Sequence, residues 1–271
     1  MDRVDLLLRD LKLKGRGLEI GPSHNPVVSK ASGLDVRILD NLDRDGLIER
    51  YREHHVKLDS IESVDYVWNG ERYVDLIGDE KCFDWIVASH VVEHTVDLIG
   101  FLKDCNSILK DDGVLSLAVP DKRYCFDRFR PISGLANVID NHLYPRRNHS
   151  AGVAAEYFMN VVSRAGKIAW GRDDRGEFEF IHTVDDALMH MELQKQEKGG
   201  VDLHAWCFVP SSFRLLIHDL KALGLMQLDE LSFKNTNGGE FFVSLSRAGK
   251  GADLSREELL LSVDEEISFA M

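Results

Sequence analysis

Residues 17–26 read GLEIGPSHNP, in which a short apolar run ends at Gly21 and continues into a polar turn. This order is typical of a first β-strand followed by a turn that binds a cofactor. A turn that wraps a dinucleotide pyrophosphate carries the pattern G-x-G-x-x-G, whose glycines let the backbone approach the phosphates. Here Pro22, Ser23 and His24 follow a single glycine. The stretch therefore predicts a ligand other than a dinucleotide, or an ordinary turn without a ligand, because glycine marks both.

The rest of the chain alternates between apolar runs and segments with helical spacing. After the first strand (15–21), strands are expected over 36–40, 64–68, 83–89 and 113–120, and helices over 44–55 and 95–110, the latter ended by DDG. Continuous apolar strands that alternate with helices predict a parallel sheet covered on both faces. A helix over 210–225 and strands over 226–233 and 238–247, joined by KNTNGG, predict a closing antiparallel hairpin.

The chain is expected to form a single domain, residues 1–271, with one insertion and a tail. Residues 123–205 contain no clean strand, many histidines and arginines, and helical stretches over 150–169 and 184–197. They predict a mostly helical insertion that covers the active site. In the tail, 248–271, Ser255 and Glu258 predict a capping box at the start of a helix over 255–267. This helix is expected on the surface or against a partner.

Composition excludes several classes of function. The net charge of −13 opposes non-specific binding to nucleic acid or to an anionic membrane. No run of about eighteen apolar residues is present, so no membrane span is expected. The N-terminal residues do not resemble a secretory signal. Four cysteines without a CxxC pair indicate a reducing, cytoplasmic location. Nothing in the sequence indicates the oligomeric state.

The order of motifs resembles the class I S-adenosylmethionine-dependent methyltransferases, in particular the type-11-like group. LEIGPSHNP stands at motif I, ILD at motif II, FDWIVASHVVEH at motif IV and LKDDGVLSLAVPDKRY at strand five. The strings ASHVVEH, VPDKRY and HAWCF are similar to a subgroup found with bacterial surface-glycan biosynthesis genes. The resemblance covers about residues 15–125 and 205–247. It implies an α/β, Rossmann-like methyltransferase sheet and S-adenosyl-L-methionine as cofactor. The departure is at motif I, where Ser23 and Asn25 replace the usual second and third glycines.

This cofactor suits the turn, because it has no pyrophosphate to be wrapped. Gly21 would let the backbone approach its amino-acid end, and Glu19 would accept from the methionyl ammonium. Ser23 and His24 would donate to its carboxylate.

Two further strand ends are expected to contribute to the cofactor site. Asp40 ends the second strand nineteen residues after Gly21, where an acid binds ribose hydroxyls, although a solvated aspartate at a strand end is an alternative. Asn69 and Gly70 follow the third strand, where adenine should lie. Trp68 beside them either stacks on adenine or belongs to the core.

The string HVVEH (90–94) also matches the inverted zinc-protease pattern H-x-x-E-H. That chemistry needs both histidines on one helix. His90 follows a strand directly, so His90 and His94 are expected on opposite sides of a corner and no metal site is predicted. Ser89 and His90 are expected to line the cofactor pocket, with Glu93 and His94 capping the next helix.

The run PDKRYCFDRFR (120–130) begins where the fifth strand ends. Asp121 is a candidate to orient or deprotonate an acceptor. Arg123, Tyr124 and Arg128 are candidates to bind an anionic small molecule or saccharide, since arginine suits phosphate or carboxylate. The alternative is an amphipathic helix with solvated arginines.

Histidines of the insertion are candidate bases, because imidazole accepts protons near neutral pH. Of His142, His149, His182, His190 and His204, we prefer His149 and His204. One i,i+4 metal-ligand pair in the insertion is His182 with Asp186.

The sequence thus predicts a methyltransferase, first of all one that O-methylates a sugar hydroxyl in a glycan or nucleotide-sugar precursor. The alternatives are a natural-product or other small-molecule O- or N-methyltransferase and a non-catalytic S-adenosylmethionine-binding protein. A dehydrogenase is disfavoured by the missing glycines.

Overall fold

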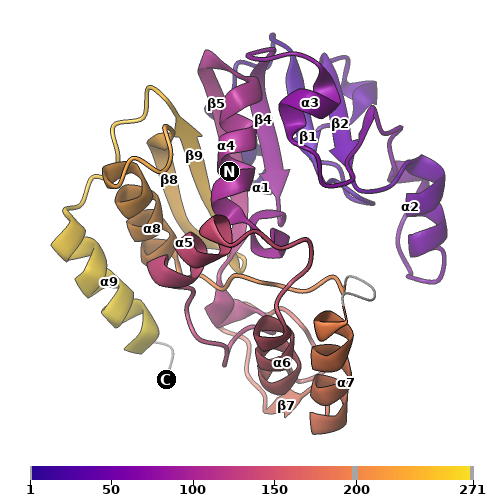
Figure 1. The fold of residues 1–271 in the computed structure, drawn as a ribbon, viewed down its shortest axis with the longest axis vertical. Helices are drawn as coiled ribbons and strands as arrows, with labels where there is room; N and C mark the ends of the chain where they lie inside the picture. The colour runs from indigo at the N-terminus through magenta and orange to yellow at the C-terminus, as the bar shows by residue number, and fades with distance from the viewer. Residues whose placement is uncertain (1, 197–200, 269–271) are drawn as a thin grey trace.

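The computed structural model describes residues 2–196 and 201–268. Its centre is a seven-stranded sheet with the order β3-β2-β1-β4-β5-β9-β8 (Figure 1). The strands are β1 (Gly17–Ile20), β2 (Val36–Asp40), β3 (Tyr66–Val67), β4 (Phe83–Ser89), β5 (Leu109–Pro120), β8 (Asp229–Asn237) and β9 (Glu240–Ser246). Strands β1 to β5 run parallel, whereas β9 is antiparallel to both β5 and β8. The predicted α/β fold with a closing antiparallel hairpin is confirmed.

The two faces of the sheet are covered differently. Helices α3 (Tyr73–Ile77), α4 (Leu98–Ile108), α5 (Leu135–Leu143) and α8 (Pro210–Ala222) contribute buried apolar side chains to the main core. Leu6 and Leu7 of α1 (Arg3–Leu8) pack on the opposite face, against Trp85 and Phe242 among others. Gly17 is needed here, because a Cβ on it would lie 1.9 Å from the Trp85 ring.

The connection from β1 to β2 contains no α-helix. Residues 21–35 form a loop whose one regular element is the short 3-10 turn η1 (Lys30–Ser32). The backbone amides after Gly21 are therefore arranged by the loop itself rather than by a helix N-terminus. Helix α2 (Arg44–Tyr51) follows β2 and lies at the rim of the molecule (Figure 1).

The insertion lies beyond the carboxyl ends of the parallel strands. It contains α6 (Ala151–Asn160), β6 (Val162–Arg164), β7 (Phe178–Phe180) and α7 (Val184–Lys195), with α6 and α7 packed together (Figure 1). The expectation of no strand between 123 and 205 is wrong, because β6 and β7 pair as an antiparallel ribbon. The helix predicted to reach residue 169 ends at Asn160, since Val161 is extended and leads into β6. Residue 197, the predicted end of the next helix, lies outside the described residues.

Other boundaries also differ. The strand expected to begin at 113 begins at Leu109, so DDG lies inside β5, which pairs with β4 from Phe83 onward. The strand expected over 64–68 is reduced to Tyr66–Val67. Helix α2 ends at Tyr51, and β8 extends through most of KNTNGG to Asn237.

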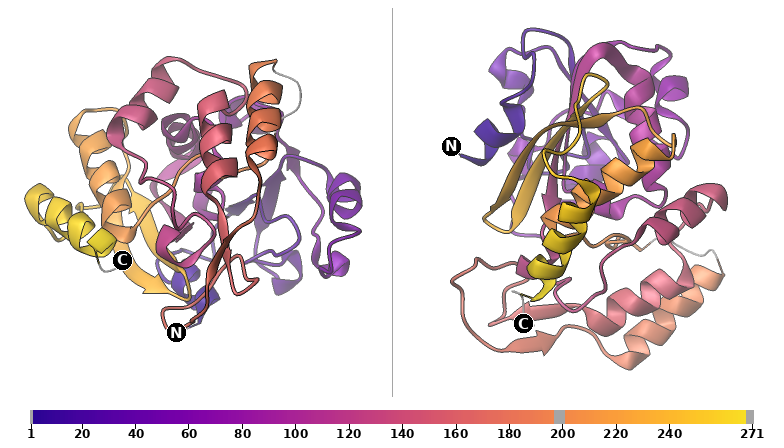
Figure 2. Two further views of the ribbon diagram at one scale, coloured as in Figure 1. Left: turned by 90° about the horizontal axis from the view of Figure 1, so that it is seen from below. Right: turned by 90° about the vertical axis from the view of Figure 1, so that its left-hand side faces the viewer.

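Helix α9 (Arg256–Ser268) runs beside α8 (Figure 2). Its predicted capping box is present, since Ser255 and Glu258 exchange backbone-to-side-chain hydrogen bonds. Glu266 accepts from the backbone and hydroxyl of Ser211 on α8. The tail therefore packs against its own chain. Among the described residues, no helix is both long and apolar enough to cross a bilayer.

Candidate active site

The turn after β1 combines two residues in the left-handed region, Gly21 (φ +62°) and Ser23 (φ +50°). A Cβ on Gly21 would lie 3.0 Å from Val91 Cγ2, so the turn lies close to the end of β4. Glu19 is buried beneath it and accepts from the backbone N–H groups of Val27 (2.6 Å) and Val28 (2.9 Å). Burial raises the pKa of Glu19 to about 7. Glu19 thus holds the loop in place, and its predicted bond to a methionyl ammonium stays a prediction.

Asp40 joins this turn to the end of β2. Its carboxylate accepts from the backbone N–H of Ser23 (3.0 Å) and of Asn41 (2.8 Å). Burial raises the pKa of Asp40. Each carboxylate oxygen has a second lone pair, so Asp40 retains acceptor capacity for a ribose diol. His24 instead packs its ring 4.6 Å from that of Tyr51, and its Nδ1 has no hydrogen-bond partner among the described residues.

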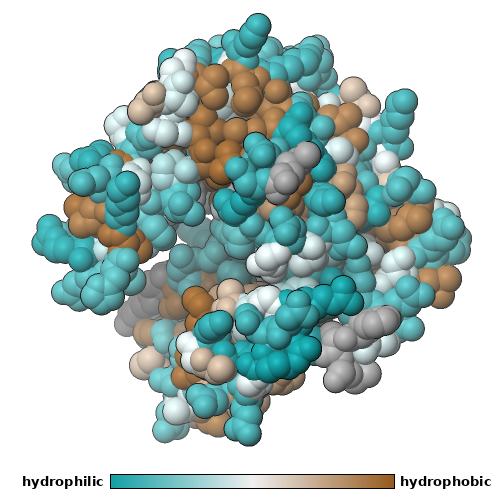
Figure 3. Space-filling model, turned by 180° about the vertical axis from the view of Figure 1, so that it is seen from behind, coloured by the Kyte–Doolittle hydropathy of each residue, from teal (hydrophilic) through white to brown (hydrophobic). Residues whose placement is uncertain are grey.

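The predicted adenine side follows β3. Trp68 is 37% exposed, so the core alternative is wrong. Its Nε1 donates to the carbonyl of Glu71 and its ring meets the edge of Tyr73. Asn69 and Gly70 (φ +96°) form the exposed turn beside it. Viewed from behind, the surface is hollowed between the body that carries the sheet and the part that carries the insertion (Figure 3). A cofactor fits the residues here, because Gly21 leaves space that a Cβ would fill and Trp68 presents an open ring.

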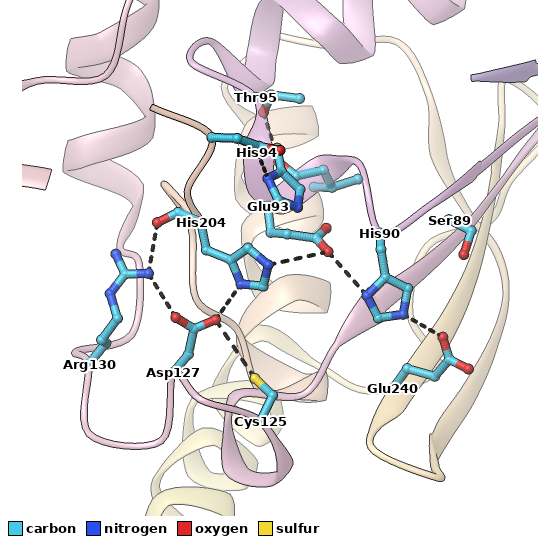
Figure 4. Close-up of polar contacts among 12 residues, drawn as sticks. Ser89, His90, Glu93, His94, Thr95, Cys125, Asp127, Arg130, His204 and Glu240 are labelled. Carbon is cyan, nitrogen blue, oxygen red and sulfur yellow. Dashed lines mark hydrogen bonds and ion pairs between the residues drawn. The ribbon is translucent and has the colours of Figure 1, made fainter. Parts of the chain in front are cut away.

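His90 stands at the carboxyl end of β4 in the left-handed region (φ +55°), a conformation that costs energy in a non-glycine residue. Its Nε2 lies 2.8 Å from Glu240 on β9 and its Nδ1 lies 3.3 Å from Glu93 (Figure 4). Burial opposes protonation of His90, but Glu240 and Glu93 together raise its pKa to about 9. Arg3 of α1 completes this corner by donating to Glu240 and to Ser89 Oγ (2.5 Å).

Glu93 continues the series of charges into the insertion. It is fully buried, and His204 Nε2 lies 4.0 Å from its carboxylate. His204 Nδ1 lies 2.5 Å from Asp127, which in turn accepts from Arg130 (2.8 Å) (Figure 4). Burial favours the neutral acid at both carboxyls, yet the neighbouring histidines, with Arg130 at Asp127, hold the pKa of Glu93 and of Asp127 below their usual values. The order Glu240, His90, Glu93, His204, Asp127, Arg130 alternates between acidic and basic side chains. We call these six residues the charge chain.

His94 lies beside the charge chain. Its Nδ1 bonds to Asp202 (2.7 Å), and its ring centre is 4.7 Å from that of His204. Ligand atoms of Glu93, His94 and His204 lie within 4.8 Å of one another, a spacing that would admit a metal ion. The expectation that Glu93 and His94 cap the next helix is wrong, because they lie in the 3-10 turn η3 (Val92–His94) and Asp97 caps α4. His90 and His94 do not face apart but share Glu93 as a neighbour.

The five candidate histidines lie in different environments in the structure. His204 belongs to the charge chain. Burial and the nearby His94 lower the pKa of His149 to about 4, so His149 is neutral at physiological pH. His142 bonds to Asp97, and His190 stacks on Phe158 at 3.9 Å, so both hold helices together. His182 also packs on Phe158, and Asp186 caps α7 rather than pairing with it.

The residues of the run 120–130, which begins at the end of β5, lie in two different environments. Asp121 is fully buried, and its oxygens accept from Arg123 (2.6 Å) and from Thr236 Oγ1 (2.5 Å). Arg123, Tyr124 and Arg128 all line one cavity of about 860 Å³. The structure thus brings together the three residues predicted to bind the acceptor. Asp121 does not line the cavity and instead holds Arg123 from a buried position.

Several residues of this region escaped sequence reasoning. Asp127 lies within the quoted run 120–130, and Asp202 lies two residues before His204 in DLH. The imidazole partner of Asp127 is His204, 77 positions away, and that of Asp202 is His94, 108 positions away, so local spacing carried no signal for either pair. Glu240 carried none, because its partner His90 is 150 residues away.

Comparison with known proteins gives the family. The model of a family described as "Methyltransferase domain" matches residues 1–185. A SAM-dependent methyltransferase from Aquifex aeolicus has a similar structure, with 10% identity over 90% of this chain and 88% of its own, at a TM-score of 0.45. The CcbJ methyltransferase from Streptomyces caelestis also has 10% identity, over 92% of this chain and 97% of its own, at a TM-score of 0.47. Neither neighbour identifies an activity at this similarity, and no curated protein matches.

Because the family match covers well over half of the chain, the protein belongs to the methyltransferase domain family and is a Rossmann-like enzyme that uses S-adenosylmethionine.

Proposed function

We propose that this enzyme O-methylates a sugar hydroxyl in a glycan or nucleotide-sugar precursor, with His204 as general base. One observation carries the proposal: His204, held through Nδ1 by the buried Asp127, belongs to the charge chain, which also includes His90 at the end of β4. Strand ends at this edge of an α/β sheet are where ligands bind. An imidazole oriented by a carboxylate is the arrangement by which enzymes remove a hydroxyl proton.

The cofactor would be held by residues at the ends of four strands, β1 to β4. Gly21 and Ser23 provide the close turn, Asp40 accepts from the ribose, and Trp68 covers the adenine. Ser89 and His90 border the methyl end. When bound, S-adenosylmethionine supplies an electrophilic methyl group on sulfur.

His204 Nε2 would take the proton that the acceptor hydroxyl loses when its oxygen bonds to the methyl group, while the bond from that group to sulfur breaks and S-adenosylhomocysteine leaves. Asp127 keeps the proton on Nδ1, so that Nε2 has its lone pair free. The gap of 4.0 Å between Nε2 and Glu93 exceeds a hydrogen bond, so a hydroxyl that reaches Nε2 also comes near the Glu93 carboxylate. Alignment of the two reacting atoms supplies much of the remaining rate.

The insertion, residues 123–205, would exclude water and select the acceptor. Arg123, Tyr124 and Arg128 bind its anionic part, and Asp121 positions Arg123. His149 is the second candidate base. The four cysteines are all free and buried, which supports a cytoplasmic location.

Incubation with S-adenosylmethionine and a panel of sugars, nucleotide sugars and amine-bearing small molecules tests this function. Mass spectrometry should find one added methyl group on a sugar oxygen. Methylation confined to non-sugar acceptors would establish the natural-product alternative instead. Cofactor binding without any transfer across the panel would favour a non-catalytic role.

A further inference from the structure

The cavity near the end of β5 gathers arginines from separate parts of the chain. Arg123 and Arg128 come from the run after β5, and Arg164, Arg172 and Arg175 come from β6 and the loop that follows it. The volume of about 860 Å³ is that of a site for a ligand the size of a nucleotide. Five arginines around one space are unexpected in a protein with a net charge of −13.

Most of these arginines carry charge that the protein does not neutralise. Arg123 is paired with Asp121, whereas no ion pair to a carboxylate is found for the other four among the described residues. Arg164 donates to the carbonyl of Gly176 and Arg175 to the carbonyl of Arg172, which orients each side chain without cancelling its charge. Burial and the nearby Arg164 and Arg123 lower the pKa of Arg128. Cations crowded in this way favour an anion between them.

Aromatic side chains line the same cavity. The ring of Phe178 is partly exposed, lies 5.5 Å from that of Trp170, and has the Arg164 guanidinium over its face at 5.0 Å. Tyr124 lines the cavity beside Gly239. A planar ring could therefore stack next to the arginines. Two carboxylates also line the space, but Glu266 is bonded to Ser211 and Glu265 is exposed.

The cavity adjoins the charge chain. Gly239 lines it, and the next residue, Glu240, bonds to His90. Tyr124 and Arg128 also line the cavity, and Asp127, between them in the sequence, bonds to His204. A ligand anchored by the arginines would thus lie beside the segments that hold the charge chain.

We propose that this cavity binds the diphosphate of a nucleoside diphosphate, the carrier to which the acceptor sugar is attached. The inference rests on the proposed function for its link to methyl transfer, but the binding itself does not. Four unneutralised guanidinium groups match the charge of a diphosphate better than that of a single carboxylate. The aromatic side chains provide the place for the nucleobase.

Calorimetry with UDP, inorganic pyrophosphate and glucuronate, without S-adenosylmethionine, tests the inference. UDP should bind more tightly than pyrophosphate, glucuronate should bind weakly or not at all, and UDP affinity should fall with added salt. Arg128→Ala and Arg172→Ala should each weaken UDP binding by roughly tenfold or more. Arg52→Ala, a change at an exposed arginine of the α2 terminus, should leave it unchanged.

Absence of UDP binding to the wild type, or equal binding to wild type and to both cavity variants, would overturn the inference. Equal affinities for UDP and pyrophosphate would show that the cavity does not recognise the nucleoside. Circular dichroism of Arg128→Ala and Arg172→Ala checks folding, and Arg172 lies on an exposed loop where loss of folding is not expected. UDP binding without methylation of any sugar would sink the proposed function and leave this inference standing.

Discussion

Asp40 is the residue on which cofactor affinity should depend most directly. Its carboxylate already fixes Ser23 and Asn41 and has lone pairs left for the ribose diol. A charge-assisted hydrogen bond of this kind contributes about 1.5–3 kcal/mol. Asp40→Ala should therefore weaken binding of S-adenosylhomocysteine by roughly ten- to a hundredfold, as measured by calorimetry. Asp40→Asn, which keeps one acceptor oxygen, should lose less. Unchanged affinity in both variants would remove Asp40 from the site.

His204 should govern the rate rather than the affinity for the cofactor. Loss of a general base lowers turnover by roughly a hundredfold or more. His204→Ala should show this loss and should keep its affinity for S-adenosylhomocysteine. The loss should be smallest at high pH, because there the acceptor hydroxyl depends less on an enzymatic base to lose its proton. Turnover of each variant is followed from pH 6 to pH 9.

His149→Ala is the matched comparison for His204. The pKa of His149 is held near 4, so its removal should leave the pH profile of turnover unchanged. A rate loss confined to His149→Ala would reverse the assignment of the base.

Turnover of the wild-type enzyme should survive treatment with EDTA. Loss on EDTA and recovery on Zn²⁺ would contradict the base role and make Glu93, His94 and His204 ligands of a metal.

The turn after β1 is the element in which a change of backbone conformation should alter both stability and cofactor binding. Gly21→Ala places a Cβ in the left-handed region, which costs about 1–2 kcal/mol, and brings it 3.0 Å from Val91. The variant should lose that stability in denaturant unfolding and should also bind S-adenosylhomocysteine more weakly.

Gly33→Ala is the control, because Gly33 lies in the same connection with φ +81° and nothing within 4 Å of the added Cβ. It should lose stability by a similar amount and keep its affinity. Equal affinity in the two variants would mean that the turn at Gly21 does not contact the cofactor.

Buried strands, exposed strands and long-range side-chain pairs of this protein differ in how well the sequence predicts them. Strands such as β4 and β9 are buried along nearly their whole length, so their apolar runs predict them well. Strand β7 alternates Phe-Glu-Phe, but it has only three residues, all exposed, and it pairs only with β6, so its pattern is too short to predict a strand. The bond between Asp127 and His204 joins residues 77 positions apart. Such pairs depend on topology, which local spacing does not contain.

Across the whole molecule, the charge chain joins the end of β4, β9 and the insertion, and it makes stability depend on pH through His90. The folded pKa of His90, about 9, is raised above its ordinary value of 6.5. Protonated His90 therefore stabilises the fold fully below pH 6.5, and this contribution is lost as pH rises through 9. The free energy of unfolding of the wild type should fall more steeply between pH 6.5 and 9 than that of His90→Gln. Urea unfolding at several pH values measures both slopes, and parallel slopes would show that His90 is not held as a cation.

The turn GLEIGPSHNP is expected to bind a methyl donor and not a dinucleotide. Calorimetric titration of the full chain with S-adenosylhomocysteine and, separately, with NADH tests it most directly. We predict saturable binding of S-adenosylhomocysteine and none of NADH, because the turn has a single glycine and Asp40 stands at the ribose position. Binding of NADH without binding of S-adenosylhomocysteine would contradict the account.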